Sequence, residues 1–508
     1  MTTLALTTTP AASLKTDALV IGVAKGPKGL VLAPGAEGLL GKVLLPALVG
    51  LGATGKAEEV TRLATLGGAP AAVIVAVGLG DAAPSYDAEV LRRAAGVASR
   101  ALAGTAKVAT TLALVNGTPG AGAVHEVSAV GEGALLGAYS FTAFRAVSAE
   151  GVKAPVVSVT VVVPDAKDKP TKAALKRAEV VGRAVSLVRD LVNTPPSHLH
   201  PVELAAVATE EAKRTGLDVE VLEGKALVKG GYGGLVGVGQ GSVNGPRLVH
   251  LSYKGKGAKA GSLKKVALIG KGITFDSGGL SLKPAAAMEE MKMDMGGAAA
   301  VIATMAAVAE LGLAVDVEAW IPMAENMPSG TAIRPSDILT MHNGLRVEVN
   351  NTDAEGRLIL ADAISRASQD SPDLMLDVAT LTGAALVALG SRTTGVMSND
   401  DDFRAAIVDA ATRAGEHSWG MPLPPELRKG LDSEIADLVN TGPREGGMLT
   451  AGLFLKEFVG EGIRWAHLDI AGPAYNSATP YGYTGHGGTG AAVRTFVQLL
   501  EDVAAGRV

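Results

Sequence analysis

The feature that most limits the fold of this chain is the repeated alternation of short apolar runs with helical patterns along most of its length. Such alternation is typical of α/β proteins, in which strands are joined by crossover helices. In the first third, strands are expected at residues 18–23, 71–79, 110–115 and 156–163, and helices at 88–102 and 131–139. Further strands are expected at 219–222, 248–253, 266–269, 315–320, 374–378 and 465–470. The pattern therefore predicts an α/β protein.

Chain length and a polar break indicate two domains. At about 150 residues per domain, 508 residues are too many for one ordinary domain. The segment 164–170 is polar and is bounded by prolines, and it precedes a helical pattern at 171–192 that ends before two further prolines. We expect an N-terminal α/β domain at 1–170, a connecting helix at 171–195 and a second domain at 196–508.

Charge and composition exclude several classes of function. The 46 Lys and Arg against 51 Asp and Glu give no basic surface for nucleic acid or an anionic membrane. Absence of cysteine excludes disulfides and thiol chemistry and is compatible with a reducing cytosol. The N-terminus shows no secretory signal, and the apolar stretches at 63–80 and 295–309 are interrupted or too short to span a membrane. A cytoplasmic protein acting on small or peptide-like partners is expected.

Polar residues interrupt the apolar second half of the chain in three segments. The strand at 266–269 runs into GKGITFDSGG, which places Lys271 and Asp276 after a buried strand, where open α/β sheets usually bind ligands. Lys283 and Asp294 follow further along the chain. Asp294 directly precedes an Ala-rich helical pattern, so taken alone it is best interpreted as a helix cap.

The third segment, 350–358, reads NNTDAEGRL and lies between apolar runs. If it is extended, its period of two places Asp353, Glu355 and Arg357 on one face. Buried like charges require a cation, and the four carboxylates of the three segments can chelate two divalent ions. The alternative is a surface salt-bridge network with Lys271, Lys283 and Arg357, but such a network needs neither the glycines nor the apolar surroundings.

The motifs GKGITFDSGG, SLKP, MKMDMGGAAA and NTDAEGRL, in this order and spacing, closely resemble those of the M17 leucyl aminopeptidase (cytosol aminopeptidase) family. Similarity extends from about residue 190 to the end, through LVNTPP, ENMPSG, ATLTGA and HLDIAG. The stretch HGGTG at 486–490 departs from the KGATG that the family suggests. The resemblance implies a macrodomain-like N-terminal domain and a catalytic C-terminal domain with a mixed, mainly parallel central sheet.

The resemblance also implies the ligands of two divalent metal ions, Mn or Zn foremost, with Mg or Co as alternatives. Lys271, Asp276, Asp294 and Glu355 would hold the tighter ion. The more exchangeable ion would be held by Asp353 together with Asp276 and Glu355, which bridge the two. Because lysine ligates metal only as a neutral amine, burial and the adjacent cations must lower the pKa of Lys271.

The implied activity is release of N-terminal amino acids, leucine and other mainly apolar residues, from peptides. Lys283 would stabilise the oxyanion of the tetrahedral intermediate, and Arg357 would hold a bicarbonate ion that relays protons. The pocket for the first side chain is expected from Met291, Met293, Thr380, Leu381, Gly383 and Ala384. Similar family members are homohexamers, dimers of trimers, so this assembly is expected too.

Other functions are weaker interpretations of the same residues. A two-metal phosphoesterase would use the same carboxylate chemistry, and a DNA-binding role, known in some bacterial relatives, would need a basic stripe that is missing here. The sequence has no P-loop, no Gly-x-Ser-x-Gly elbow and no His-Glu-x-x-His motif. His467 and Asp469 alternate on an apolar strand and are interpreted as core residues, outside the site.

Overall fold

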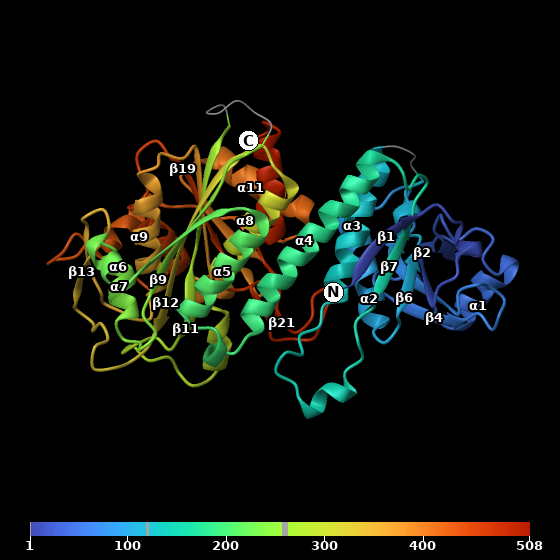
Figure 1. Cartoon of the computed structure of the whole chain (residues 1–508), viewed down its shortest axis with the longest axis horizontal. Coiled ribbons are helices and arrows are strands. Elements are labelled where there is room, and N and C mark those ends of the chain that lie inside the picture. The colour runs from blue at the N-terminus through green and yellow to red at the C-terminus, as the bar shows by residue number, and fades with distance from the viewer. Residues whose placement is uncertain (1, 118–120, 257–262) are drawn as a thin grey trace. The chain divides into compact units, whose positions relative to one another are not determined.

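The computed structural model describes residues 2–117, 121–256 and 263–508, which form two compact α/β units (Figure 1). One unit consists of Met1–Ser186 and Ala478–His486, and the other of Leu187–Ser477 and Gly487–Val508. The division falls within α4 (Lys169–Asn193), the long helix expected after the polar break. The two-domain mixed α/β fold is thus confirmed.

The N-terminal unit is built on a sheet with the strand order β1-β7-β6-β2-β5-β4, in which β3 pairs with β2. Most of its strand pairs are parallel, and helices α2 and α3 pack against each other beside it. The strands are β1 (Thr3–Thr7), β2 (Ala18–Gly26), β3 (Gly29–Leu32), β4 (Val60–Ala64), β5 (Val73–Asp81), β6 (Lys107–Thr110) and β7 (Ser158–Val162). The helices are α1 (Leu44–Gly50), α2 (Ala88–Ala101) and α3 (Ala121–Gly137).

The prediction of one strand in this unit is wrong. The run at 110–115 was expected to be extended, but β6 ends at Thr110 and a 3-10 turn follows at Leu112–Leu114. The Thr110 hydroxyl accepts a hydrogen bond from the backbone N–H of Leu112 at 3.2 Å, which closes the chain into this turn. A local side-chain bond of this kind competes with the ladder of the sheet.

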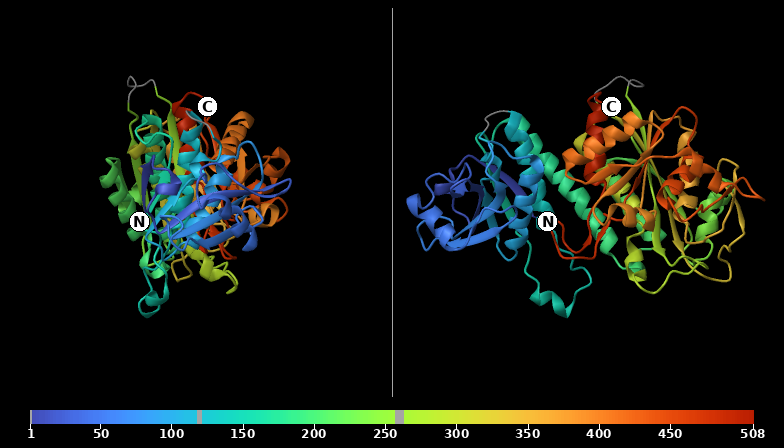
Figure 2. Two further views of the ribbon diagram at one scale, coloured as in Figure 1. Left: turned by 90° about the vertical axis from the view of Figure 1, so that its right-hand side faces the viewer. Right: turned by 180° about the vertical axis from the view of Figure 1, so that it is seen from behind.

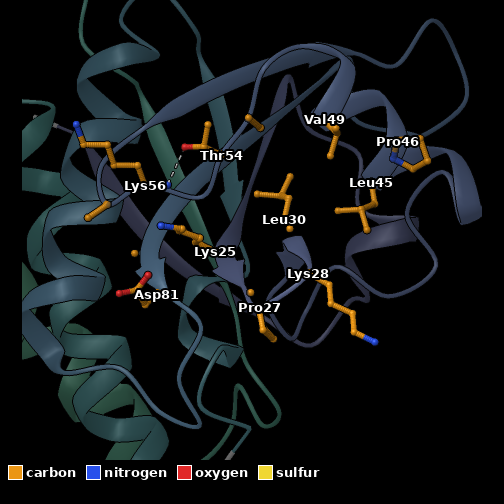
Figure 3. A pocket seen from close by; sticks show the side chains of 15 residues that line it. Lys25, Pro27, Lys28, Leu30, Leu45, Pro46, Val49, Thr54, Lys56 and Asp81 are labelled. Atoms are coloured by element: carbon orange, nitrogen blue, oxygen red, sulfur yellow. Dashed lines mark hydrogen bonds between the residues drawn. The ribbon is translucent and has the colours of Figure 1, made fainter.

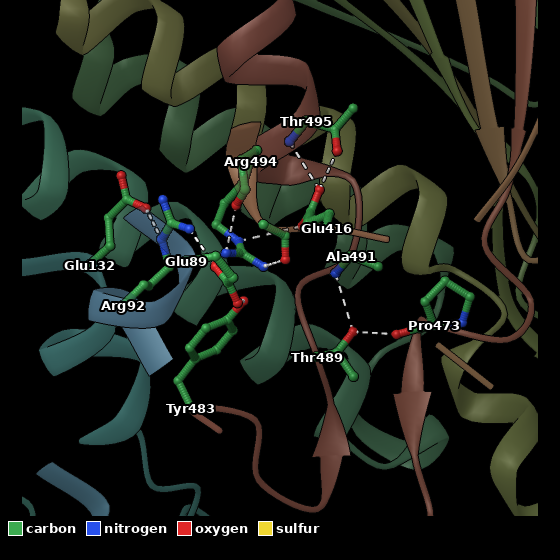
Figure 4. Close-up of polar contacts among 12 residues, drawn as sticks. Glu89, Arg92, Glu132, Glu416, Pro473, Tyr483, Thr489, Ala491, Arg494 and Thr495 are labelled. Atoms are coloured by element: carbon green, nitrogen blue, oxygen red, sulfur yellow. Dashed lines mark hydrogen bonds and ion pairs between the residues drawn. The ribbon is translucent and has the colours of Figure 1, made fainter. Parts of the chain in front are cut away.

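Buried ion pairs and a returning segment stabilise the N-terminal unit. Arg92 pairs with Glu132 at 2.8 Å and also with Glu89, which in turn accepts a hydrogen bond from the Tyr483 hydroxyl at 2.8 Å (Figure 4). Tyr483 lies in the short segment Ala478–His486, far from the rest of this unit in sequence. A contact between side chains this far apart in sequence cannot be derived from local sequence patterns.

A cavity of about 1070 Å³ lies over the C-terminal ends of β2 and β5 in the N-terminal unit (Figure 3). Part of the wall is apolar and is formed by Leu30, Leu45 and Val49. The side chains of Lys28 and Lys56 are exposed and extend away from the cavity. These two lysines therefore do not point into the cavity.

The second unit is built on a sheet with the order β17-β16-β19-β15-β10-β12-β9-β8, in which β11 pairs with β12. β10 pairs in parallel with both β12 and β15, while β8 and β9 add an antiparallel edge. Its longer strands are β8 (Asp218–Glu223), β9 (Arg247–Tyr253), β10 (Lys265–Gly270), β11 (Gly272–Asp276), β12 (Asp316–Asn326), β15 (Leu374–Ala379), β16 (Thr394–Ser398) and β19 (Arg464–Asp469). The sheet is mixed and mainly parallel, as expected.

Helices cover both faces of this sheet (Figures 1 and 2). α8 packs on β10, β12 and β15, and α9 packs on β10 and β12 from the other side. The helices of the unit are α5 (Pro201–Thr215), α6 (Lys225–Lys229), α7 (Gly233–Gly239), α8 (Gly296–Leu311), α9 (Gly356–Ser368), α10 (Gly383–Leu389), α11 (Asp401–Ala414), α12 (Gly447–Lys456) and α13 (Val493–Ala504). Short strands complete it: β13 (Ile338–Thr340), β14 (Arg346–Glu348), β17 (Ser418–Gly420), β18 (Leu438–Val439), β20 (Tyr475–Asn476) and β21 (Gly487–Gly488).

Among the described residues, one helical stretch, Met288–Leu311, has the length and apolarity to cross a membrane. Of its most apolar window, 89% is buried inside the structure, because α8 lies against the central strands. A buried core helix passes the same test, so the stretch is weak evidence for a membrane span.

Asp362 on α9 makes the stability of the second unit depend on pH. Burial raises the pKa of its carboxyl to about 7, although the backbone N–H groups of Leu235 and His342 donate hydrogen bonds to it at 2.9 and 2.8 Å. In the unfolded chain this pKa is about 3.9, so from about pH 4 to 7 only the folded protein keeps the proton. The stability contribution is complete below about pH 4 and is lost as the pH rises through about 7.

The unfolding midpoint of the second unit in urea should therefore fall over this pH range, and the slope should be smaller in the Asp362→Asn variant. Tryptophan fluorescence follows this unit alone, because all three tryptophans, Trp320, Trp419 and Trp465, belong to it. Substitution of the exposed Asp402 by asparagine serves as the control. Equal slopes in the wild type and the Asp362 variant would contradict the expected result.

Candidate functional site

The candidate site lies at the C-terminal edge of the central strands of the second unit. Lys271 joins β10 to β11, Asp276 is the last residue of β11, and Thr380 directly follows β15. Asn326 is the last residue of β12, which lies between β10 and the antiparallel strand β9. Because parallel strands end at the same edge, side chains that are far apart in sequence converge there.

Lys271 lies at the centre of the first cluster. Its Nζ is 2.8 Å from Asp294 Oδ1, 2.8 Å from Glu355 Oε1 and 2.9 Å from the carbonyl oxygen of Thr380. The side chain is 3% exposed and runs directly beside Gly356, where a Cβ would lie 2.6 Å from Lys271 Cε. A side chain at position 356 would therefore displace Lys271 from its present position beside the acids.

Lys283 links the acids of the second cluster. Its Nζ is 2.8 Å from Asp276 Oδ2 and also forms an ion pair with Asp353. The ligand atoms of Asp276, Asp353 and Glu355 all lie within 4.8 Å of one another. The acids and lysines expected from the three sequence segments are thus brought together at one site.

The local conformation of NTDAEGRL differs from the extended one that we expected. Asp353 lies in a turn, and Glu355 has helical φ and ψ of −77° and −36° directly before α9. The side chain of Asn351 makes the turn by accepting a hydrogen bond from the Asp353 N–H at 2.9 Å. The acids therefore converge through a turn and a helix start, and not through strand alternation.

The capping interpretation of Asp294 is also wrong. The residue that precedes α8 is Met295, and no side-chain cap bond is made there. Asp294 Oδ1 instead accepts a hydrogen bond from the Thr380 hydroxyl at 2.7 Å and lies beside Lys271. The carboxylate therefore contacts Thr380 and Lys271 in the site and does not cap the helix.

The carboxylates of the site carry more negative charge than the neighbouring lysines compensate. Burial raises the pKa of Asp276, Asp294 and Asp353 above the ordinary value, although the neighbouring lysines lower it. Burial lowers the pKa of Lys271, but the charges of Asp294 and Glu355 outweigh it, and the pKa stands above its usual range. These carboxylates stabilise the ammonium form of Lys271, so burial alone does not make it neutral, and a lowered pKa beside bound metal ions stays a prediction.

The residues present fit a divalent cation. Asp294 Oδ2 and Glu355 Oε2 are buried and have no hydrogen-bond partner within the part of the chain that the structure describes. A bare carboxylate oxygen in a buried site is costly unless a cation compensates it. Carboxylate oxygens with one nitrogen ligand suit Mn²⁺, Zn²⁺ or Mg²⁺.

Arg357 lies in the first turn of α9 and faces the same region. Its Nη1 donates a hydrogen bond to the Asn440 carbonyl at 2.8 Å, whereas its Nε is buried without a partner. Burial lowers the pKa of Arg357 to about 10, against the charges of Glu355 and Asp469. It therefore remains a cation at neutral pH and keeps a free donor.

The six expected pocket residues lie on two segments beside the acids. Met291 and Met293 are half-buried in the 3-10 turn Met288–Met293. The others belong to the loop between β15 and α10 or to the start of α10: Thr380, Leu381, Gly383 and Ala384. The loop is fixed by Asp469, which accepts hydrogen bonds from the Thr382 hydroxyl at 2.7 Å and from the Leu381 N–H at 3.2 Å.

His467 is confirmed as a core residue. It is fully buried, and its Nδ1 is 2.5 Å from Asp377 on the neighbouring strand. The sequence reasoning missed two asparagines. The Asn326 side chain donates a hydrogen bond to Asp276. The side-chain oxygen of Asn440 accepts hydrogen bonds from the backbone N–H groups of Asn350 and Asn351. Only the ENMPSG motif carried a signal for the first, and none marked the second.

Comparison with known proteins agrees with this geometry. The sequence models of the cytosol aminopeptidase family match the chain over residues 186–497 for the catalytic domain and over residues 20–148 for the N-terminal domain. The chain belongs to the cytosol aminopeptidase family. It is accordingly a metal-dependent aminopeptidase, a hydrolase of peptides.

Relatives in this family match the chain over nearly their whole length. It is 56% identical to the probable cytosol aminopeptidase of Streptomyces avermitilis, over 100% of this chain and 99% of the relative, and 52% identical to that of Rhodococcus erythropolis, over 96% and 95%. Among solved structures, the bottromycin maturation enzyme BotP in complex with Mn is 38% identical, with a TM-score of 0.84 over 96% of this chain and 100% of that chain. A mutant of tomato leucine aminopeptidase is 32% identical, with a TM-score of 0.87 over 99% and 96%.

Proposed function

We propose that the site holds two divalent metal ions and releases N-terminal residues, leucine and other mainly apolar ones, from peptides. Lys271, Asp276, Asp294 and Glu355 would hold the tighter ion, and Asp276, Asp353 and Glu355 the more exchangeable one. The observation that carries the proposal is the close approach of three carboxylates, with ligand atoms within 4.8 Å of one another, in a site with bare buried oxygens. Two such ions supply a nucleophilic water and polarise the scissile carbonyl.

In this proposal the protein's own cations act on the reacting peptide. The charges of Asp276 and Glu355 outweigh the effect of burial and raise the pKa of Lys283, so Lys283 is a cation at neutral pH. Its side chain is 19% exposed, more than that of Lys271, which suits a group that stabilises the oxyanion of a substrate. Arg357, with its free Nε donor, would hold a bicarbonate ion, which can accept and return a proton.

The proposal also covers the substrate pocket, the domain bounds, the assembly and the location of the enzyme. Met291, Met293 and the loop at 380–384 would receive the first side chain of the substrate. Residues 196–508 would be the catalytic domain, 171–195 the connecting helix and 1–170 the N-terminal domain. The enzyme would work in the cytoplasm as a homohexamer, with Mn or Zn as the metals.

Removal of the metals tests the proposal. After chelation the protein should lose nearly all activity on leucine p-nitroanilide, and Mn²⁺ or Zn²⁺ should restore it with two ions bound per chain. Elemental analysis of the wild type before and after chelation measures that stoichiometry. A phosphate ester assayed in parallel separates the alternative two-metal chemistry, because activity on the ester alone would contradict the peptidase.

A further inference from the structure

The two most buried aspartates of the site each have one oxygen that accepts a hydrogen bond from a neutral protein donor. Asp294 Oδ1 accepts a hydrogen bond from the Thr380 hydroxyl at 2.7 Å and lies 2.8 Å from Lys271 Nζ, while its Oδ2 is buried without a partner among the described residues. Asp276 Oδ1 accepts from Asn326 Nδ2 at 2.8 Å and from the Gly278 N–H at 2.9 Å, while its Oδ2 faces Lys283. In both aspartates, the surrounding donors distinguish the two chemically equivalent oxygens.

Thr380 is held firmly enough to orient Asp294. The residue is 5% exposed, and its carbonyl oxygen accepts a hydrogen bond from Lys271 Nζ at 2.9 Å. The next two residues of its loop are bound by Asp469. One threonine therefore contacts both Asp294, through its hydroxyl, and Lys271, through its carbonyl.

Asn326 is fixed in the same way beside Asp276. It is 1% exposed, and its Nδ2 donates to Asp276 Oδ1 and, at 3.0 Å, to the carbonyl oxygen of Thr352, the residue before Asp353. Both partners are acceptors, so the amide orientation follows from the contacts. The Asn326 side chain thereby joins the end of β11 to the turn that carries Asp353.

We propose that Thr380 and Asn326 are positioning residues that determine which oxygen of Asp294 and of Asp276 faces the metals. The inference rests on the proposed function, in which both aspartates are metal ligands. Asp294 belongs to the tighter site alone, so Thr380 acts on one ion. Asp276 is shared, so Asn326 acts on both ions. Partners of metal ligands typically contribute roughly 10- to 100-fold to metal affinity or activity.

The test for Thr380 compares two variants that separate its hydroxyl from its shape. Thr380→Val keeps the branched shape and removes the donor, whereas Thr380→Ser keeps the donor. Mn²⁺ affinity, measured by competition with a fluorescent chelator, should fall roughly 10- to 100-fold at the tighter site in the valine variant. The other site should be unchanged, and the serine variant should bind like the wild type. Thr380→Ala replaces the valine variant if that protein does not fold.

Thr304 on α8 provides a matched control for this substitution. It is also fully buried, but its hydroxyl has no hydrogen-bond partner. Thr304→Val should therefore bind both Mn²⁺ ions as the wild type does. Equal loss of affinity in the Thr304 and Thr380 variants would overturn the proposal, because it would show a general effect of packing.

The test for Asn326 uses Asn326→Leu, which removes both donors at similar volume, with Asn326→Ala as the second variant. Both Mn²⁺ affinities should fall. Asn399→Leu is the control, because Asn399 bonds only backbone groups of Ile463 and Trp465 in the contacts described.

The outcomes separate this inference from the proposed function. Wild-type protein that binds fewer than two Mn²⁺ ions would overturn the proposed function itself. Wild-type protein that binds two, with Thr380→Val and Asn326→Leu binding equally well, would leave that function standing and overturn the positioning role. Loss at both sites in Thr380→Val would overturn the assignment of Thr380 to one ion.

Discussion

Replacing Glu355 by glutamine should remove metal binding and nearly all aminopeptidase activity. Glu355 Oε1 lies 2.8 Å from Lys271 Nζ, Oε2 is buried without a partner, and the group is close to both Asp276 and Asp353. It is the residue that joins the two clusters. An amide supplies no charge, and its NH2 group would face either Lys271 or the metals. Because bound metals contribute several kcal/mol to catalysis, kcat/KM should fall by roughly 10³-fold or more.

The experiment combines elemental analysis with kinetics on leucine p-nitroanilide. Glu416→Gln is the control, because Glu416 is a half-buried acid of this unit that accepts hydrogen bonds from Thr495 on α13 (Figure 4). The control should keep both metals. If Glu355→Gln kept two metals and full turnover, the proposed ligand assignment would be wrong.

Replacing Lys283 by alanine should have the opposite effect on binding and an equally clear effect on turnover. The variant should keep its metals, because loss of a cation beside Asp276 and Asp353 makes the site more negative. Without the ammonium, the oxyanion of the intermediate loses a stabilising charge. Removal of one such group typically lowers kcat by about 10²- to 10³-fold, and KM should change much less.

Lys264→Ala is the control for this substitution. Lys264 is exposed and pairs with Asp373 at 3.6 Å, a surface contact of little energetic value. Metal content and kcat should both be unchanged in it. Loss of metal from the Lys283 variant would identify this lysine as a structural partner of the ligands, and unchanged kcat would exclude oxyanion stabilisation.

Much of the candidate site could be predicted because its polar residues stand out against apolar surroundings. Lys271 and Asp276 follow the expected strand, and the segments with Asp294 and NTDAEGRL were found by composition before any family resemblance. Their local geometry could not be predicted in this way. Asp294 alone has the sequence signature of a cap, and its actual partner, Thr380, is 86 residues away.

The contacts of Thr380 show which part of the site could not be predicted. Thr380 was expected as a pocket residue, but no sequence pattern indicates that its hydroxyl binds Asp294 and its carbonyl oxygen binds Lys271. Asn326 and Asn440 are single amides in loops or at a strand end, and no spacing marks them. Their roles depend on partners that are far away in sequence: Asp276 and Thr352 for Asn326, and residues 350–351 for Asn440.

The sequence by itself determined the α/β alternation, the break before the long helix and the identity of the charged residues, because periodicity and composition are local properties of the chain. Only the tertiary structure decided that Asp353 and Glu355 converge through a turn and a helix start, that Lys271 passes over Gly356, and that Tyr483 returns to the N-terminal unit. These arrangements depend on hydrogen bonds and close packing between segments far apart in sequence. Such contacts form only when the sheet has brought its strand ends together.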